Sequence, residues 1–187
     1  MDPRLLLQQL HLAERLKDAT RHCYTSGGRH ESVAEHSWRL CLMAWFLRDE
    51  FPELDMDKVL QMCLIHDLGE CFTGDIPTFL KSNADTDKED NLLLNWVATL
   101  PEPYCTDMTA LYAEMAALET GEAKLYKALD KLEAVIQHNE SPLDTWLPLE
   151  YELNLTYGND AVAFSPYLKA LRAEVLANTQ KKIAEEK

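Results

Sequence analysis

Apolar residues recur at helical spacing along most of the chain, and glycine or proline residues interrupt the pattern between one run and the next. Residues three or four positions apart share one face of an α-helix, so this repeat is typical of amphipathic helices that pack on a common core. It predicts helices over residues 4–19, 32–49, 55–66, 91–100, 107–119, 122–139, 143–156 and from Pro166 onward. No segment alternates apolar and polar residues as a half-buried strand does. We therefore expect an all-α fold of about eight helices.

Two polar segments are expected to be loops. Residues 20–32 contain a Gly-Gly pair that disfavours a helix, and the charged residues 81–90 are expected to be exposed until the following helix begins. At the end of the first loop, Ser32 and Glu35 have the spacing of a capping box, in which each side chain accepts from a free backbone N–H at the helix start. The second helix is therefore expected to begin at Ser32, or at Glu31 before it.

The length and charge of the chain limit its organisation and its partners. A chain of 187 residues forms one domain with a substantial core and leaves little for a second, so residues 1–187 are expected to be a single domain. The chain has 18 Lys and Arg against 32 Asp and Glu, and a net charge of −14 repels a nucleic acid polymer. A small anionic substrate stays open, because a few local cations or a metal outweigh the overall field at short range.

The cysteines and the N-terminal segment indicate the cellular compartment in which the protein is expected. The five cysteines are an odd number and include no CxxC pair, so we expect reduced thiols that pack as small apolar residues. The N-terminal segment lacks the pattern of a secretory signal, and no stretch approaches the roughly 18 apolar residues of a membrane span. The expectation is a cytoplasmic protein that does not engage a membrane.

An unusual group of polar residues lies where the apolar run of the third predicted helix stops. His66 and Asp67 end the run, and Glu70 and Asp75 follow within nine residues. A carboxylate at a helix C-terminus is disfavoured by the helix dipole, and an ionised carboxylate in a buried setting needs a partner. A divalent cation would supply that partner, although a solvated helix end is the alternative interpretation.

Two further residues are candidates to join this group. His36 lies one and two turns before Leu40 and Ala44 and so faces inward, although a single inward histidine is more often a hydrogen-bonded core residue than a ligand. Asp130 flanks an apolar stripe, where an ion pair with a neighbouring lysine is the simpler interpretation. Taken together, two imidazoles and two carboxylates suit Mn²⁺, Fe²⁺, Co²⁺, Ni²⁺ or Zn²⁺ with positions left for water and substrate.

The set His36, His66-Asp67 and Asp130 resembles the H…HD…D signature of the HD-domain metal-dependent phosphohydrolases. The segments ESVAEHSWR (31–39), HDLGECFTGDIP (66–77) and EAKLYKALDKLE (122–133) are similar to three motif blocks of one branch, which contains the bacterial HD-type 5′-deoxynucleotidases and the eukaryotic HD-domain-containing protein 2. The resemblance extends over a motif core of about residues 21–139 and leaves the C-terminal helices of residues 143–187 outside it.

The resemblance implies a helical fold around one divalent metal ion and hydrolysis of nucleoside 5′-monophosphates, that is, an enzyme that is a phosphoric monoester hydrolase. It favours Mn²⁺ or Co²⁺, with Fe²⁺, Ni²⁺, Zn²⁺ or Mg²⁺ also compatible, and it leaves a homodimer open. The metal ligands that it implies are His36, His66, Asp67 and Asp130.

It also implies roles for three residues near the metal. Arg21 would bind the substrate phosphate, and Glu70 and Asp75 would be the catalytic acids. We assign Glu70 to positioning the attacking water and Asp75 to protonating the leaving group. His22 occupies the position where the bacterial enzyme has a tryptophan associated with rejecting ribose, so the preference between deoxyribose and ribose stays open.

Two alternatives remain. One keeps the metal site and changes the substrate to a nucleoside triphosphate or another small phosphate ester. The other is a non-catalytic helical regulatory or interaction protein with a vestigial pocket, which the retention of Arg21, Glu70 and Asp75 beside the four implied ligands argues against.

Overall fold

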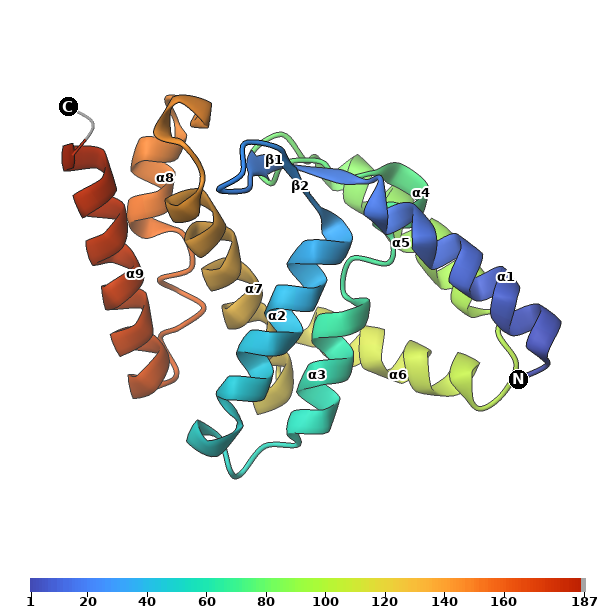
Figure 1. Ribbon diagram of the computed structural model, residues 1–187. Helices are drawn as coiled ribbons and strands as arrows, with labels where there is room; N and C mark the ends of the chain where they lie inside the picture. The colour runs from blue at the N-terminus through green and yellow to red at the C-terminus, as the bar shows by residue number, and fades with distance from the viewer. Residues whose placement is uncertain (186–187) are drawn as a thin grey trace.

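The computed structural model describes residues 1–185 and is almost entirely helical (Figure 1). Its α-helices are α1 (Pro3–Ala13), α2 (Val33–Phe46), α3 (Met56–Ile65), α4 (Glu70–Thr73), α5 (Asn83–Val97), α6 (Tyr104–Ala117), α7 (Gly121–Glu140), α8 (Glu150–Thr156) and α9 (Pro166–Glu185). Short 3₁₀-helices cover Glu14–Lys17, Arg48–Glu50 and Leu143–Thr145, and two strands, β1 (Thr20–Tyr24) and β2 (His30–Ser32), complete the order. The all-α prediction is confirmed apart from this one hairpin.

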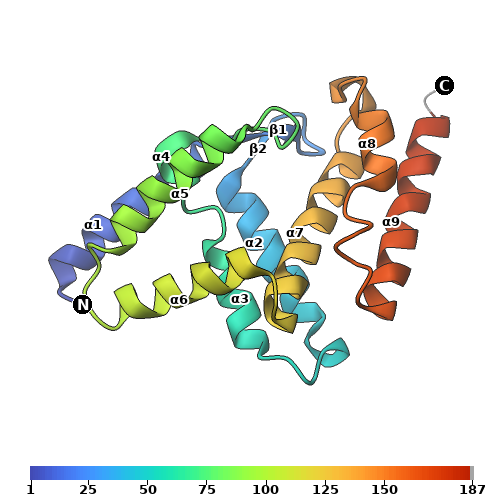
Figure 2. The same cartoon turned by 180° about the vertical axis from the view of Figure 1, so that it is seen from behind.

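Helix α7 is at the centre of the fold. It packs against α2 and α3 on one side and against α9 on the other, and α6 and β1 also contact it. Figures 1 and 2 show α8 and α9 on one flank of α7, with α1, α4, α5 and α6 gathered beyond α2 and α3 on the opposite flank. The core residues Leu40, Met62, Leu125, Leu129 and Leu132 are completely buried between α2, α3 and α7. These three helices therefore form the rigid support for any site between them.

The helix starts that support the predicted site lie where the sequence indicates. Ser32 caps α2, with both hydrogen bonds of the capping box to Glu35 present. Asp55 caps α3 by accepting from the backbone N–H of Lys58 at 3.1 Å. Because each cap fixes the first turn, it also fixes which later residues of the helix face the core.

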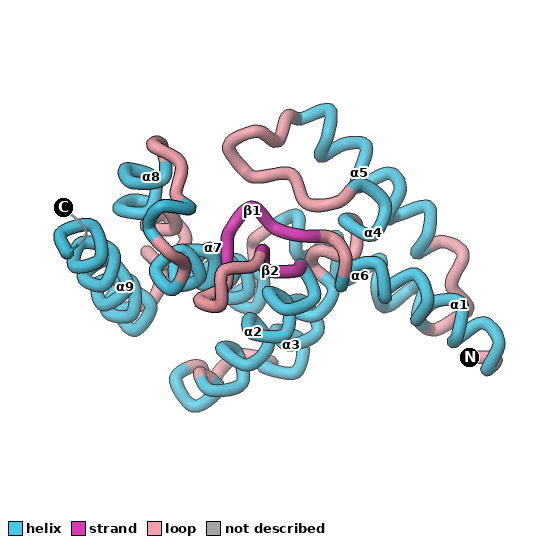
Figure 3. Tube along the Cα trace, turned by 45° about the horizontal axis from the view of Figure 1, so that its top comes forward, coloured by secondary structure: helices cyan, strands magenta, loops and turns pink. Residues whose placement is uncertain are grey.

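The loop predicted for residues 20–32 is instead an antiparallel hairpin, so that expectation was wrong. Strands β1 and β2 pair from Thr20 with Ser32 to Tyr24 with His30, with an irregular register between them. Gly28 takes a φ of 81° in the connecting turn, a conformation that favours glycine. Strands of five and three residues are too short to show a clear alternation in the sequence. Figure 3 shows the hairpin between α7 and the α4–α5 region.

Three helix boundaries also differ from the prediction. The first helix ends as a 3₁₀ turn at Lys17, and α5 begins at Asn83 inside the expected exposed loop, because Ser82 and Asp85 form a second capping box. The helix predicted for residues 143–156 is split into a 3₁₀ turn and α8, with Pro148 between them. Proline lacks the N–H that would continue the helix.

All five cysteines are free thiols in the structure, as the sequence predicts. Within residues 1–185, none of the helices combines the length and apolar character needed to cross a membrane.

Candidate active site

A cavity of about 410 Å³ opens between α7, the hairpin, the segment after α3, and α8. Every residue predicted for the site except His66 lines it: Arg21, His36, Asp67, Glu70, Asp75 and Asp130. His66 lies directly beneath, because its Nε2 contacts Asp67 and His36. Residues separated by more than a hundred positions in the sequence therefore meet in one concave site.

The four residues implied as ligands come from three helices and converge on one point. His36 lies one turn inside α2, His66 caps the C-terminus of α3 with Asp67 next to it, and Asp130 lies midway along α7. His36 Nε2 is 3.2 Å from His66 Nε2 and 3.2 Å from Asp130 Oδ1. His66 Nε2 is 2.9 Å from Asp67 Oδ2 and 3.8 Å from Asp130 Oδ1.

This arrangement fits a divalent ion. Ligand atoms about 2.1 Å from a shared ion, at right angles to one another, lie about 3 Å apart. The nitrogen and oxygen atoms of His36, His66, Asp67 and Asp130 have separations of 2.9–3.8 Å, close to that spacing. His66 Nδ1 lies 2.9 Å from the backbone oxygen of Cys63, so this nitrogen donates and Nε2 is left to face the site.

The electrostatics favour a cation at the same point. Burial opposes ionisation of Asp67, but the neighbouring His66 lowers its pKa to about 2. Burial also opposes ionisation of Asp130, and Lys127 together with His36 holds its pKa well below the usual range. Burial and Arg21 lower the pKa of His36, yet hydrogen bonds to Asp130 and Glu133 outweigh them and raise it to about 10. The proton that His36 retains thus supplies positive charge at the place that a metal would take.

Glu133 is a residue of the site that the sequence interpretation missed. Its side chain is completely buried in α7 and contacts Nδ1 of His36. The carboxylate also accepts from Arg39 Nε at 2.6 Å and from Arg21 Nη1 at 3.2 Å. Burial opposes ionisation of Glu133, but the bond to His36, followed by Arg21 and Arg39, lowers its pKa to about 2. Its position one turn after Asp130 on the same helix face was the signal available in the sequence.

Arg21 enters the cavity from β1. Its Nη1 donates to Glu31 at 3.1 Å and to Glu133 at 3.2 Å, which places the guanidinium between two buried carboxylates. Among residues 1–185, Nε and Nη2 of Arg21 have no hydrogen-bond partner. A guanidinium fixed on one edge and unpaired on the other is suited to an anionic ligand in the cavity.

The two implied catalytic acids, Glu70 and Asp75, also line the cavity. Glu70 is 7% exposed, and its buried Oε2 has no hydrogen-bond partner within the described part of the chain. Burial, followed by repulsion from Asp67, Asp75 and Glu89, raises the pKa of Glu70 to about 9. Burial also raises the pKa of Asp75. The positive charge of Arg21 lowers this pKa, and the negative charge of Asp67 raises it further.

Lysines in the cavity wall were not predicted either. Lys81, Lys127 and Lys131 line the cavity together with Arg21, although the chain as a whole is strongly acidic. Lys127 Nζ lies 2.7 Å from Asp130 Oδ2, so the ion pair first considered as an alternative to metal binding coexists with the contact between Asp130 and His36. Each lysine pairs with a carboxylate, Lys81 with Glu89, Lys127 with Asp130 and Lys131 with Asp160, so these cations offset acidic charge around the cavity.

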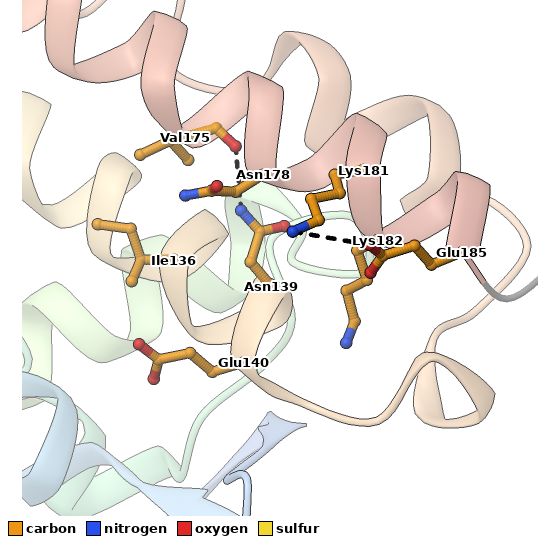
Figure 4. A pocket seen from close by; sticks show the side chains of 8 residues that line it. All are labelled: Ile136, Asn139, Glu140, Val175, Asn178, Lys181, Lys182 and Glu185. Atoms are coloured by element: carbon orange, nitrogen blue, oxygen red, sulfur yellow. Dashed lines mark hydrogen bonds and ion pairs between the residues drawn. The ribbon is translucent and has the colours of Figure 1, made fainter.

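A second hollow, of about 350 Å³, lies between α7 and α9 (Figure 4). Several of its polar groups pair with one another: Asn139 Nδ2 donates to the Val175 carbonyl at 3.1 Å, and Lys181 pairs with Glu185 at 3.6 Å. Among residues 1–185, no histidine lines it, and the two acids that do, Glu140 and Glu185, each pair with a cation. The first cavity is therefore the candidate site.

Comparison with known proteins identifies the family and the fold of the chain. Residues 13–172 match the HD domain family. The chain is 31% identical to 5′-deoxynucleotidase HDDC2 of Homo sapiens over 141 residues, which is 73% of this chain and 68% of that protein. The crystal structure of a predicted metal-dependent phosphohydrolase from Magnetospirillum magnetotacticum MS-1 is similar with a TM-score of 0.76 and 26% identity, over 95% of this chain and 93% of that one. A conserved hypothetical protein from Pyrococcus furiosus is similar with a TM-score of 0.71 and 30% identity, over 90% and 98%.

Proposed function

The chain belongs to the HD domain family, and on that premise we propose that it is a divalent-metal-dependent 5′-nucleotidase. The substrate in this proposal is a nucleoside or deoxynucleoside 5′-monophosphate, and the products are the nucleoside and phosphate. The observation that carries it is the convergence of two imidazoles and two carboxylates beside the unpaired edge of Arg21. The relatives named 5′-deoxynucleotidase support the same substrate class.

His36, His66, Asp67 and Asp130 would hold the metal ion. When bound, a divalent ion lowers the pKa of a coordinated water to about 7 and offsets negative charge on phosphoryl oxygens. Mn²⁺ and Co²⁺ are the ions we propose, because the family resemblance favours them and a mixed set of imidazoles and carboxylates with open positions accommodates them.

The residues around this set divide the remaining tasks. Arg21 binds the phosphate through its unpaired edge and neutralises charge as it develops. Glu70 positions the attacking water through its unpaired buried oxygen, and a cation beside Asp67 opposes the repulsion that raises the pKa of Glu70. Asp75, with its raised pKa, protonates the departing 5′-oxygen.

We also propose a domain organisation, an oligomeric state and a cellular location for the protein. We propose one domain over residues 1–187, because α2, α3, α7 and α9 share a single core. We propose a homodimer, because Trp38, Trp45 and Phe46 on α2 leave an apolar surface uncovered. A cytoplasmic location accords with five free cysteines.

Phosphate release from a panel of nucleoside mono-, di- and triphosphates in the presence of Mn²⁺ or Co²⁺ tests the proposed reaction. We expect turnover of the monophosphates and little release from the triphosphates. Strong hydrolysis of triphosphates with inert monophosphates would contradict the proposal and favour a triphosphate hydrolase. Turnover of no phosphate ester, without metal binding, would favour a non-catalytic protein.

A further inference from the structure

The cavity continues well beyond the metal-binding residues, along the same face of α7. Asp130, Ala134 and His138 all line it and are spaced one helical turn apart. Eight residues of α-helix span about 12 Å, so the cavity is much longer than a phosphate group. Its far end is closed by α8, which supplies Glu150, Leu153 and Asn154 to the lining.

The far wall is fixed in place by a buried carboxylate. Glu150 is 2% exposed, and its Oε1 lies 2.9 Å from His138 Nε2 and 3.2 Å from His22 Nε2. Its Oε2 accepts from the backbone N–H of Leu147 at 2.6 Å. The ring of His22 packs edge-on against Phe79, with ring centroids 5.8 Å apart. Glu150 thus holds the imidazole of His138 by a hydrogen bond and lies close to His22, whose Nε2 has no hydrogen-bond partner among residues 1–185.

Asn154 of α8 has a side-chain nitrogen, Nδ2, that is buried and has no hydrogen-bond partner among residues 1–185. The residue is 3% exposed and lines the cavity. Its backbone is well anchored, since Arg172 of α9 donates to the carbonyls of Asn154 and Tyr157 at 3.0 Å each. A buried amide without partners costs stability, and a ligand that pairs with it recovers that free energy.

Resting on the proposed function, we infer that α8 forms the nucleoside subsite and that Asn154 contacts the base of the substrate. With the phosphate at Arg21 and the metal-binding residues, the sugar and base extend along α7 toward α8. An asparagine amide presents one donor and one acceptor side by side, which matches the paired donor and acceptor on the edge of a nucleobase. Glu150 is a positioning residue that acts through His138.

The test compares a nucleotide with a substrate that lacks the base. Asn154→Leu removes both hydrogen-bonding atoms at similar volume, and Asn159→Ala, in the exposed turn after α8, is the matched control. We expect Asn154→Leu to lower kcat/KM for a deoxynucleoside 5′-monophosphate by about tenfold. Its kcat/KM for deoxyribose 5-phosphate should equal that of the wild type, and Asn159→Ala should change neither.

Equal losses on both substrates, or no loss on either, would overturn the inference. Circular dichroism checks the fold, and Asn154→Ser replaces the leucine variant if that variant fails to fold. Calorimetric binding of a deoxynucleoside without phosphate separates the two proposals. If the wild type hydrolyses no monophosphate yet Asn154→Leu weakens nucleoside binding relative to Asn159→Ala, the proposed function fails and the subsite stands. If nucleoside binding is the same in both variants, the subsite inference is wrong.

Discussion

Glu133 accepts a hydrogen bond from Nδ1 of His36 in the buried interior between α2 and α7. An ionised carboxylate can only accept, so Nδ1 carries the proton and Nε2 is the nitrogen directed to Asp130 and His66. A carboxylate behind a metal-ligating histidine fixes its tautomer and ring orientation and raises its basicity. Arg21 and Arg39 hold Glu133 in turn, so the pair belongs to a network that reaches the cavity wall.

We predict that Glu133→Gln weakens metal binding by roughly tenfold, because the neutral amide no longer enforces the required tautomer of His36. Isothermal titration of the metal-free protein with Mn²⁺ measures the effect. Glu140→Gln is the matched control, because Glu140 also pairs with Arg39 but lies half-exposed at the end of α7. Equal affinities for the two variants would show that Glu133 does not orient His36.

Glu70→Ala should retain the metal and lose turnover. Glu70 lies beside the four converging residues and is not one of them, and its proposed task is to position the attacking water. Loss of a positioned acid or base lowers kcat by about 10²–10⁴. Metal content by mass spectrometry and phosphate release from the same sample give the result. A variant that lost its metal would instead make Glu70 a ligand.

The stability of the metal-free protein should fall as the pH rises, and Glu70 should account for part of the fall. Its pKa is about 9 in the fold against an ordinary value of 4.5, so the native state retains a proton that the unfolded chain releases. This contribution is fully present below pH 4.5 and is lost as the pH rises toward 9.

Glu70→Gln removes that dependence. In chelator at pH 8, its Tm should exceed that of the wild type by about 2–4 °C, and the difference should shrink toward pH 4.5. Thermal melts across this range are the measurement. A wild type that is as stable as the variant at pH 8 would show that the Glu70 carboxyl is not destabilised in the fold.

Trp45→Lys should convert a homodimer into a monomer. Trp38 and Trp45 are 64% and 51% exposed and lie two turns apart on the same face of α2. A lysine in a buried apolar interface leaves an unpaired charge, which disfavours association. Light scattering after gel filtration measures the mass, and Leu7→Lys on exposed α1 is the control. A wild type that is already monomeric would contradict the proposed dimer.

Local sequence patterns predict the inward face of His36 and the position of His66-Asp67, whereas their convergence was implied by the family resemblance. The Ser32–Glu35 capping box fixes the start of α2 and hence the inward face of His36, and the end of the apolar run in α3 places the His-Asp pair. These features depend on neighbours within one or two turns, which a sequence contains. The start of α5 is a further local feature, because Ser82 and Asp85 form a capping box. The prediction of an exposed loop over residues 81–90 gave more weight to the charged composition of this segment than to that box.

The remainder of the site depends on contacts between distant segments. Glu133 looks like a polar flank of an apolar stripe until His36 and Arg21 are placed against it. The partnerless amide of Asn154 is visible only once α8 closes the end of the cavity. The spacing of Glu133 from Asp130 is the one local signal for the first residue, and no local pattern marks Asn154, because the partners of both lie elsewhere in the chain. The β1–β2 hairpin was missed because its strands are too short for a recognisable period.

The most direct test of the central claim is phosphate release from a deoxynucleoside 5′-monophosphate by one preparation assayed in three states: as purified, with EDTA, and with Mn²⁺ or Co²⁺ restored. The proposal predicts activity that EDTA abolishes and the metal restores, and no restoration in His66→Ala, because that variant lacks one of the four converging groups. Release that persists unchanged in EDTA would contradict a metal-dependent mechanism at this site.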